Sequence, residues 1–272
     1  MSEKVSIDEK YARLLERISG LGSAAVAFSG GVDSSFLCYA AVEALGKRAM
    51  AITIVSPMLP KSEIDFATTL ARQVGIEHLL VTEREIEEDV AANPKDRCYF
   101  CKKLEFGAIQ AAAASRGVSA VLDGSNLDDL QDYRPGLKAL EELRIVSPLR
   151  EAALTKADIR ELSRRVGLVS WDKPAFACLA SRIPYGERID DEKLRRIERA
   201  EDALRAYGFR QLRVRSHENI ARIEVAAEER RRFFDEALLD DVSRVLKSYG
   251  FLYVTFELEG YKTGSMNQPI KA

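Results

Sequence analysis

A short stretch rich in glycine and serine, SGGVDSS at residues 29–35, joins an apolar run to a segment with helical character. Such a turn between a buried strand and a helix presents backbone N–H groups and the positive end of the helix dipole, which together bind phosphate. Gly30 and Gly31 permit a tight turn and the close approach of a ligand. Hydroxyl donors are added by Ser29, Ser34 and Ser35. The stretch lacks the lysine of a Walker A loop and the spacing of a dinucleotide fingerprint, so it predicts another kind of phosphate loop. The alternative is an ordinary turn with a serine cap.

Three of the four cysteines stand in two segments that could hold a metal. Cys98 and Cys101, in NPKDRCYFCK, are one helical turn apart, so their sulfurs can converge on one metal centre. Cys178, in PAFACLASR, lies in an irregular segment. If these thiolates bind a 4Fe-4S cluster, one iron keeps an open position for a further ligand. A cysteine pair without metal and a zinc site are the alternatives, and Cys38, on an apolar helix, is expected in the core.

Polar residues also gather where predicted strands end. The segment DGSNLDD places Asp123, Asn126, Asp128 and Asp129 at the mouth of a strand, where they suit nucleotide or metal contacts. Aspartate and asparagine also form turns without any ligand, so not all of these residues need be functional.

Two arginines alternate in a later strand. Arg213 and Arg215 are two residues apart, so both point to one face, where two guanidiniums could grip a phosphate of the substrate. A solvated basic face is the alternative. The only histidines are His78 and His217, which argues against histidine-based catalysis.

These segments belong to an alternating series of strands and helices. Apolar runs that predict strands lie at residues 23–29, 48–56, 77–83, 118–126 and 143–149. Helical patterns lie at residues 34–45, 61–74, 104–116 and 155–168. Buried strands alternating with helices predict an α/β fold with a parallel sheet covered on both faces. Ligands of such sheets bind at the carboxyl ends of the strands, where SGGVDSS lies.

The pattern changes after this alternation. Residues 1–170 are expected to form the α/β domain, and residues 171–189 a structured loop that carries Cys178. Residues 190–272 are expected to form a smaller α+β domain for substrate binding and oligomerisation. Its expected elements are a helix at 191–207, strands at 211–217 and 221–227 joined by the turn SHEN, a helix at 228–249 and a strand at 251–259.

The composition is that of a soluble globular protein, with 46% hydrophobic and 31% charged residues. The 41 basic and 43 acidic residues give a net charge of -2, which offers no positive excess to nucleic acid. No apolar run reaches the roughly 20 residues of a membrane span, and the N-terminus lacks the apolar core of a signal peptide. The cytoplasm is therefore expected, where four cysteines suggest free thiols or ligands more than disulfides.

The phosphate loop resembles the SGGxDS loop of the PP-loop ATP pyrophosphatases, which cleave ATP to AMP and pyrophosphate while adenylating a substrate. The resemblance implies that Asp33 supports Mg2+. It implies pyrophosphate contacts for Ser29, Gly30, Gly31, Ser34 and Ser35. Ser56 resembles the position that meets adenosine in these enzymes, against the alternative of an ordinary serine at a strand end.

Seven motifs extend this resemblance over nearly the whole chain. In order they are SGGVDSS, NPKDRCYFCK, DGSNLDD, RPG, SPLRE, KPAFACLASRIPYG and RVRSHENIARIEV. Together they resemble the LarE family of sulfurtransferases, which make the nickel-pincer nucleotide cofactor of lactate racemase. Members of that family adenylate a carboxylate of pyridinium-3,5-biscarboxylic acid mononucleotide with ATP and then replace the adenylate by sulfur to give a thiocarboxylate.

The same resemblance implies roles for individual residues. Some members surrender the sulfur of the single cysteine at the position of Cys178, which becomes dehydroalanine, whereas others carry three cysteines and resemble cluster-dependent enzymes. This sequence matches the second kind. Ser181 and Arg182 are implied substrate neighbours, and Glu201 and Glu224 resemble acidic positions associated with metal. The expected partner is a small nucleotide substrate, and the expected assembly is a homo-oligomer.

Three other functions share some of these features. A tRNA thiolase uses a PP-loop and cysteines, but would be expected to bring an RNA-binding appendage or a basic surface. A PP-loop amidotransferase needs an ammonia source, and no glutaminase domain fits in 272 residues. A non-catalytic nucleotide sensor would not need three placed cysteines.

Overall fold

The computed structural model describes residues 5–131, 135–174 and 177–262 of the chain. It divides into two compact units, one formed by residues 1–84 and 98–176 and the other by residues 85–97 and 177–272. A segment from the middle of the first half, residues 85–97, thus belongs to the second unit. Arg134 of the RPG motif and residues 175–176 of the KPAFACLASRIPYG motif lie outside the described residues.

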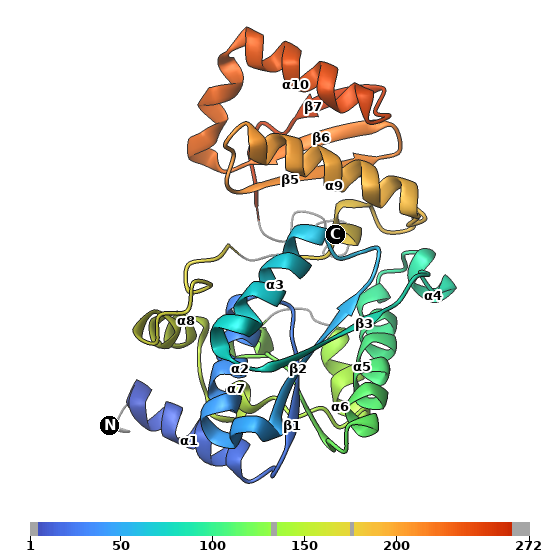
Figure 1. Ribbon diagram of the computed structural model, residues 1–272. Helices are drawn as coiled ribbons and strands as arrows, with labels where there is room; N and C mark the ends of the chain where they lie inside the picture. Colours follow the sequence, from blue (N-terminus) through green and yellow to red (C-terminus); the bar gives the residue numbers. More distant parts are fainter. Residues whose placement is uncertain (1–4, 132–134, 175–176, 263–272) are drawn as a thin grey trace. The chain divides into compact units, whose positions relative to one another are not determined.

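The first unit is built on a parallel sheet with helices on both faces (Figure 1). Among the described residues four strands pair in the order β3-β2-β1-β4, and every pairing is parallel. The strands are β1 (Ala24–Ala27), β2 (Ala49–Val55), β3 (Glu77–Thr82) and β4 (Ala120–Leu122). The helices are α1 (Ile7–Ser19), α2 (Val32–Leu45), α3 (Lys61–Val74), α5 (Arg97–Ser115), α6 (Gly136–Glu142), α7 (Pro148–Glu151) and α8 (Lys156–Arg165). Short 3-10 helices are η1 (Gly46–Arg48) and η2 (Leu127–Gln131). The α/β class predicted from the alternating pattern is confirmed.

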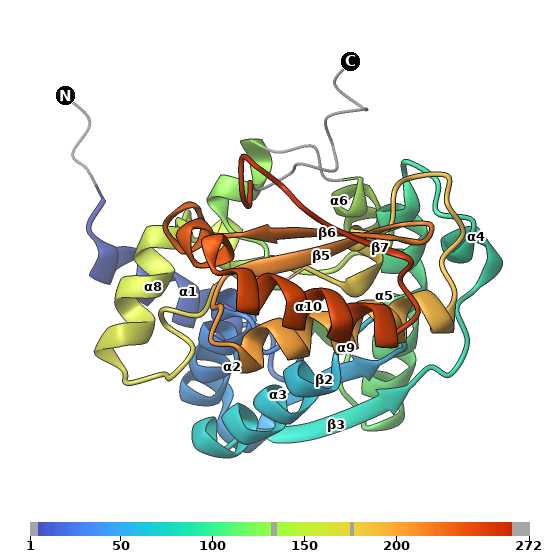
Figure 2. The same cartoon turned by 90° about the horizontal axis from the view of Figure 1, so that it is seen from above.

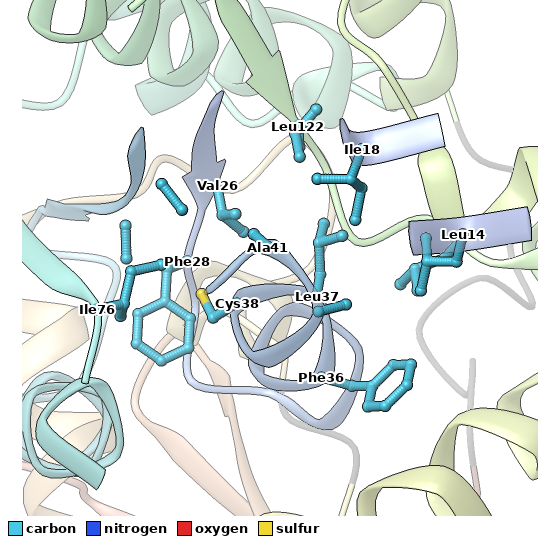
Figure 3. Packing of buried hydrophobic residues seen from close by; sticks show 14 of the residues in the cluster. Leu14, Ile18, Val26, Phe28, Phe36, Leu37, Cys38, Ala41, Ile76 and Leu122 are labelled. Carbon is cyan, nitrogen blue, oxygen red and sulfur yellow. The ribbon is translucent and has the colours of Figure 1, made fainter. Parts of the chain in front are cut away.

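Two apolar cores sandwich this sheet. On one face Val26 of β1 packs with Leu37 and Cys38 of α2, and α1, α3 and α8 complete that core (Figure 3). On the other face Ala25 packs in a second cluster with residues of α5 and α6, among them Ile109. Neighbours in β1 therefore face opposite cores, as the period of two in a strand requires. Cys38 is fully buried, so its prediction as a core residue is confirmed.

Three predicted elements of this unit need correction. The predicted strand at 143–149 is only an isolated parallel bridge between Leu122 and Val146, because Pro148 begins α7 directly afterwards. The predicted strand at 118–126 shortens to β4, since the polar DGSN residues leave the sheet at its end. The predicted helix at 104–116 begins earlier, at Arg97. This longer α5 carries both Cys98 and Cys101 in its first turns.

The second unit has a smaller mixed sheet of β5 (Leu212–His217), β6 (Ile220–Val225) and β7 (Tyr253–Phe256), ordered β5-β6-β7 over the described residues. β5 and β6 are antiparallel, whereas β6 and β7 are parallel. Helices α9 (Asp191–Ala206) and α10 (Glu236–Ser248) share one core with this sheet, and Figure 2 shows the two helices side by side. The remaining elements are α4 (Glu88–Ala91), η3 (Leu179–Arg182) and η4 (Ala227–Phe234).

The predicted helix at 228–249 is interrupted. Its first part is the 3-10 helix η4, and α10 starts afresh after Asp235. The Asp235 carboxylate accepts hydrogen bonds from the backbone N–H groups of Ala237 at 2.9 Å and Leu238 at 3.3 Å. An aspartate cap of this kind satisfies the free N–H groups of a new helix start, which is why one helix becomes two.

Asn93 ties residues 85–97 to the segment after Cys178. Its side chain is fully buried and donates to the carbonyls of Pro184 at 2.7 Å and Glu187 at 2.9 Å. Arg97 then donates from Nη1 to Asn93 Oδ1 at 2.5 Å and to the Ala180 carbonyl at 3.1 Å. These bonds explain why a segment from the first half joins the second unit. In the described part of the chain, no helix is both long and apolar enough to cross a membrane.

Candidate active site

The phosphate loop lies between the end of β1 and the start of α2, at the carboxyl edge of the sheet. Gly31 is the N-cap of α2 and has no side chain to satisfy the first N–H groups of that helix. The serine hydroxyls bond within the loop: Ser35 Oγ donates to the Gly31 carbonyl at 2.6 Å, and Ser29 Oγ lies 3.1 Å from Ser34 Oγ. A helix start of this kind is suited to an anion.

The two glycines of the loop have different roles. Gly30 has a φ of +69°, and a Cβ there would lie 3.1 Å from the Cβ of Ala67 on α3. Gly31 has a φ of -77° and a ψ of 167°, which any residue adopts, and a Cβ there would lie 3.4 Å from Ser29 Oγ. The fold therefore requires glycine at position 30. At position 31 the fold does not require it, and the missing Cβ leaves the backbone open to the approach of a ligand.

Asp33, in the first turn of α2, combines a paired and an unpaired carboxylate oxygen. Its Oδ2 accepts a bond from Lys156 Nζ at 2.5 Å, whereas its Oδ1 is buried and has no hydrogen-bond partner among the described residues. Burial raises the pKa of this carboxyl, and the attraction of Lys156 opposes the rise. A buried carboxylate oxygen beside a phosphate loop suits a hard cation such as Mg2+.

Basic side chains that the sequence reasoning missed surround this loop. Lys173 Nζ donates to the Gly30 carbonyl at 3.2 Å and to Glu63 Oε2 at 2.7 Å. Arg160, on α8 with Lys156, donates to the carbonyls of Trp171 at 2.7 Å and Lys173 at 2.9 Å. Lys173 is the first residue of the KPAFACLASRIPYG motif, and this position could have indicated a functional role. No motif contains Lys156 or Arg160, so the sequence does not indicate a role for them. Such cations can balance the charge of ATP phosphates.

The DGSN loop after β4 touches the phosphate loop. A Cβ on Gly124 would lie 3.1 Å from the backbone N of Ser34, so only glycine permits this approach. Asp123 accepts hydrogen bonds from the hydroxyls of Ser125 and Ser147, and from the Ser125 N–H at 2.9 Å. Asp123 therefore holds the shape of the loop in this structure, and its contact with a nucleotide stays a prediction.

Asn126 and Asp128 also organise this loop. Asn126 Oδ1 accepts from the Asp128 N–H at 2.9 Å, and Asp128 Oδ2 accepts from the Lys156 N–H at 2.8 Å. Asp129 Oδ2 accepts from the Asn126 N–H at 3.0 Å.

Ser56 directly follows β2, at the same edge of the sheet, and its carbonyl accepts from the Leu59 N–H. The contacts of these residues with ATP stay predictions.

The candidate sulfur ligands are partly exposed cysteines. Cys98 and Cys101 lie on α5 in the first unit, and Cys178 is the N-cap of η3 in the second unit. Cys38 differs, because burial raises the pKa of its thiol well above the ordinary value. Among the described residues of each unit, no three histidine, cysteine, aspartate or glutamate side chains gather as a metal site.

Arg213 and Arg215 share the face of β5 opposite the apolar core. Arg215 donates to Glu224 Oε2 at 2.8 Å and to the Ser181 carbonyl at 3.0 Å. The Arg213 guanidinium lies 5.1 Å from the centre of the Tyr261 ring, and burial lowers its pKa. The alternation predicted for RVR thus holds, with Arg215 paired to an acidic residue. A phosphate contact for either arginine stays a prediction.

Arg182 and Glu201 are fully buried and pair with each other. Arg182 Nε lies 2.8 Å from Glu201 Oε1, and Nη2 lies 3.0 Å from Oε2. Glu201 also accepts from the Val214 N–H and from Arg205, both at 3.1 Å. Although burial opposes ionisation, Arg182 holds the pKa of Glu201 below its ordinary value. Both carboxylate oxygens are thus engaged with protein donors, and the predicted metal role of Glu201 gains no support from these contacts.

Glu224, the second predicted metal-associated residue, is buried between arginines. Its Oε2 pairs with Arg215, and its Oε1 lies 3.1 Å from Arg222 Nη2. Arg222 continues the chain of charges to Glu257 at 3.0 Å. The metal role of Glu224 stays a prediction, and its described contacts are those of a buried ion-pair network.

Comparison with known proteins agrees with this geometry. The asparagine synthase family matches residues 16–134, which contain the phosphate loop and the DGSN loop. An uncharacterized protein of Synechocystis sp. is 44% identical over 96% of this chain and 98% of its own length. An uncharacterized protein of Methanocaldococcus jannaschii is 30% identical over 88% of this chain and 90% of its own length.

One relative has a named activity. The pyridinium-3,5-bisthiocarboxylic acid mononucleotide synthase of Lactiplantibacillus plantarum is 37% identical over 96% of this chain and 95% of its own length. This match covers the phosphate loop, the cysteine segments and the second unit together, which confirms the family predicted from the sequence motifs. The chain therefore belongs to the family of the pyridinium-3,5-bisthiocarboxylic acid mononucleotide synthase, a family of enzymes.

Proposed function

We propose that this protein uses ATP to convert the carboxylates of pyridinium-3,5-biscarboxylic acid mononucleotide to thiocarboxylates, a step in making a nickel-pincer nucleotide cofactor. The observation that carries the proposal is the phosphate loop with the unpaired Asp33 oxygen beside it, in a chain 37% identical to the named synthase. A carboxylate is a poor electrophile, because expelling an oxide is unfavourable. Adenylation turns that oxygen into a leaving group, and a sulfur nucleophile then attacks the acyl carbon and releases AMP.

The first unit carries out the ATP half of the reaction in this proposal. The N–H groups at the start of α2 and the loop hydroxyls hold the phosphates that leave as pyrophosphate. Lys156 and Lys173 lie beside the loop and balance the charge of those phosphates. The Asp33 oxygen without a partner fits Mg2+, which would neutralise the phosphates and orient them for attack by the substrate carboxylate. Asn126 and Ser56 lie at the same edge of the sheet and are proposed nucleotide contacts.

Three cysteines are proposed to serve the sulfur half of the reaction. Cys98 and Cys101 are partly exposed one turn apart on α5, so both thiolates can reach one metal centre. We propose that these three thiols hold a 4Fe-4S cluster, which would keep one iron without a protein ligand and free to carry sulfide. Without such a cluster, Cys178 itself would be the sulfur donor.

The second unit is proposed to bind the substrate. Arg213 and Arg215 place two guanidiniums on one face of β5, and the substrate carries a phosphate that such groups bind well. Ser181, whose carbonyl accepts from Arg215, connects this face to the segment after Cys178. The cytoplasmic location and the homo-oligomeric assembly expected from the sequence stay predictions.

The test follows both halves of the reaction in one anaerobic preparation. The protein receives ATP, Mg2+, sulfide and the pyridinium substrate, and AMP, pyrophosphate and thiocarboxylate are measured. We expect AMP and pyrophosphate in equal amounts, brown protein with thiolate-to-iron absorption, and more than one thiocarboxylate per chain. Alanine at Cys98, Cys101 or Cys178 should remove the absorption, whereas Cys38→Ala, the matched control in the core, should keep it.

Three results would contradict parts of this proposal. ADP and phosphate as the main products would exclude adenylation of the carboxylate. One turnover followed by loss of the mass of hydrogen sulfide, with dehydroalanine at position 178, would exclude the cluster and assign the sulfur to Cys178. Thiolation of tRNA without thiocarboxylate formation would move the protein to the alternative function.

A further inference from the structure

We propose that Arg182 is a positioning residue that fixes the backbone around Cys178, with Glu201 holding its guanidinium in place. The inference rests on the proposed function, because it gives Cys178 a part in sulfur transfer. It gives Arg182 and Glu201 roles through their contacts with each other and with the backbone around Cys178, while the substrate contact of Arg182 and the metal contact of Glu201 stay predictions.

The contacts of one guanidinium nitrogen carry the inference. Arg182 Nη1 donates to the carbonyls of Ala177 and Cys178, the second at 2.9 Å, and to Ser181 Oγ at 3.1 Å. These acceptors are the backbone on both sides of the Cys178 side chain and the first polar side chain after it. A planar guanidinium that bonds consecutive carbonyls restricts the backbone torsions between them. Arg182 therefore fixes the direction of the Cα–Cβ bond that carries the Cys178 thiol.

The other two nitrogens connect this segment to the core of the second unit. Arg182 Nε and Nη2 make a bidentate pair with Glu201 on α9, and Glu201 Oε1 also accepts from the Val214 N–H on β5. Both charged side chains have 0% of their surface exposed. All three guanidinium nitrogens thus have protein acceptors, and none faces solvent. These contacts are those of a guanidinium that holds protein groups in place.

The test separates positioning from substrate binding with the variant Arg182→Lys. Lysine keeps the charge opposite Glu201 but lacks the planar fork that reaches Glu201 and the Cys178 carbonyl together. We expect the release of pyrophosphate in the first turnover, which reports adenylation, to stay within twofold of the unchanged protein, because the phosphate loop lies in the first unit. We expect sulfur transfer to fall at least tenfold and the KM for the pyridinium substrate to change less than twofold.

A second readout does not depend on the proposed reaction. The full chain, with reduced thiols and no added iron, is alkylated with iodoacetamide, and the rate at each cysteine is followed by mass spectrometry. We expect the rate at Cys178 to change at least threefold in Arg182→Lys, while the rates at Cys98 and Cys101 stay within their error. The matched control is Arg196→Lys. Arg196 is also a buried arginine of the second unit, but it donates to Gly250 and Glu218 carbonyls and not to the Cys178 segment.

Each outcome decides the inference. Folded Arg182→Lys protein with unchanged Cys178 alkylation would overturn it, and so would a raised KM for the pyridinium substrate with unchanged alkylation. An equal change at Cys178 in Arg196→Lys would overturn it as well, because any buried arginine would then have the same effect. If the unchanged protein makes no thiocarboxylate, the proposed function fails, and the alkylation rates still test whether Arg182 positions Cys178. Glu201→Gln, which keeps the shape of the partner, should shift the Cys178 rate in the same direction as Arg182→Lys.

Discussion

Replacing Gly31 by alanine should remove ATP cleavage while leaving the fold intact. The φ and ψ at this position, -77° and 167°, suit any residue, and an added Cβ meets Ser29 Oγ only at 3.4 Å. Alanine restricts the unfolded chain and so stabilises by about 0.4–1 kcal/mol, but it is a poorer N-cap than glycine by a similar amount. The free energy of unfolding should therefore change by less than about 0.5 kcal/mol.

The loss of ATP cleavage can be sized from the contacts that the methyl group blocks. A hydrogen bond between a backbone N–H and a charged phosphate is worth about 1.5–3 kcal/mol. Displacing one such bond should lower kcat/KM for ATP roughly 10- to 150-fold. The assay is release of AMP and pyrophosphate under saturating pyridinium substrate, with unfolding in urea measured on the same protein.

Gly30→Ala should lower the free energy of unfolding, because here the fold needs glycine. Its φ of +69° costs an L-residue about 1–2 kcal/mol, and the Cβ of Ala67 at 3.1 Å must move in addition. The matched control is Gly117→Ala, which has a φ of +71° but nothing within 4 Å of an added Cβ. The difference between these two variants in the free energy of unfolding isolates the cost of the contact with Ala67 on α3.

Two results would refute this division of roles. If Gly31→Ala keeps its kcat/KM for ATP within twofold, no phosphate approaches the backbone at that position. If Gly30→Ala destabilises the protein no more than Gly117→Ala does, crowding against Ala67 does not contribute to the loss of stability.

Further variants test the charges of both units. Asp33→Asn should abolish AMP formation without lowering stability at neutral pH. Burial raises the pKa of Asp33 in the folded protein. The carboxyl therefore favours folding most below its unfolded pKa of about 3.9 and loses that contribution as the pH rises through the folded pKa. A urea midpoint that falls for Asp33→Asn at pH 7 would contradict this sign. Arg213→Ala should weaken binding of the pyridinium substrate at least tenfold and leave ATP binding unchanged, as measured by calorimetry, because a charge-assisted contact is worth about 1.5–3 kcal/mol. Arg215→Ala should weaken the same binding. It should also lower the urea midpoint of unfolding, since it removes a partner of the buried Glu224. An unchanged affinity for the pyridinium substrate in both arginine variants would place the phosphate elsewhere.

Much of the fold followed from local patterns in the sequence. The buried runs before SGGVDSS and DGSN predicted the parallel sheet, because strands covered on both faces are apolar throughout. The phosphate loop could be predicted because glycines and serines between a strand and a helix are typical of a phosphate-binding turn. The break before α10 was also marked, since Asp235 stands before EALL as an N-cap, but the continuous helical pattern around it concealed the signal.

The rest depended on contacts between residues far apart in the chain. Lys156 lies 123 positions after Asp33, and no local spacing indicates that the two meet. The sequence predicted roles in the site for Arg182 and Glu201 but not their pairing, because a motif gives residue types without their partners. Whether an arginine faces a substrate or a buried glutamate is decided by the tertiary fold alone.

The Asn93 contacts have a consequence for how the chain is made. Asn93 bonds to Pro184 and Glu187, so residues 85–97 cannot complete their part of the second unit until those partners have been synthesised. At a synthesis rate of roughly 5–20 residues per second, the ribosome needs roughly 5–20 s to cover that distance. During this time the Asn93 side chain remains without these final partners, although β1, β2 and β3 have already been synthesised. The path of the chain thus sets the order of folding. The second unit is completed late, although its segment 85–97 is synthesised early.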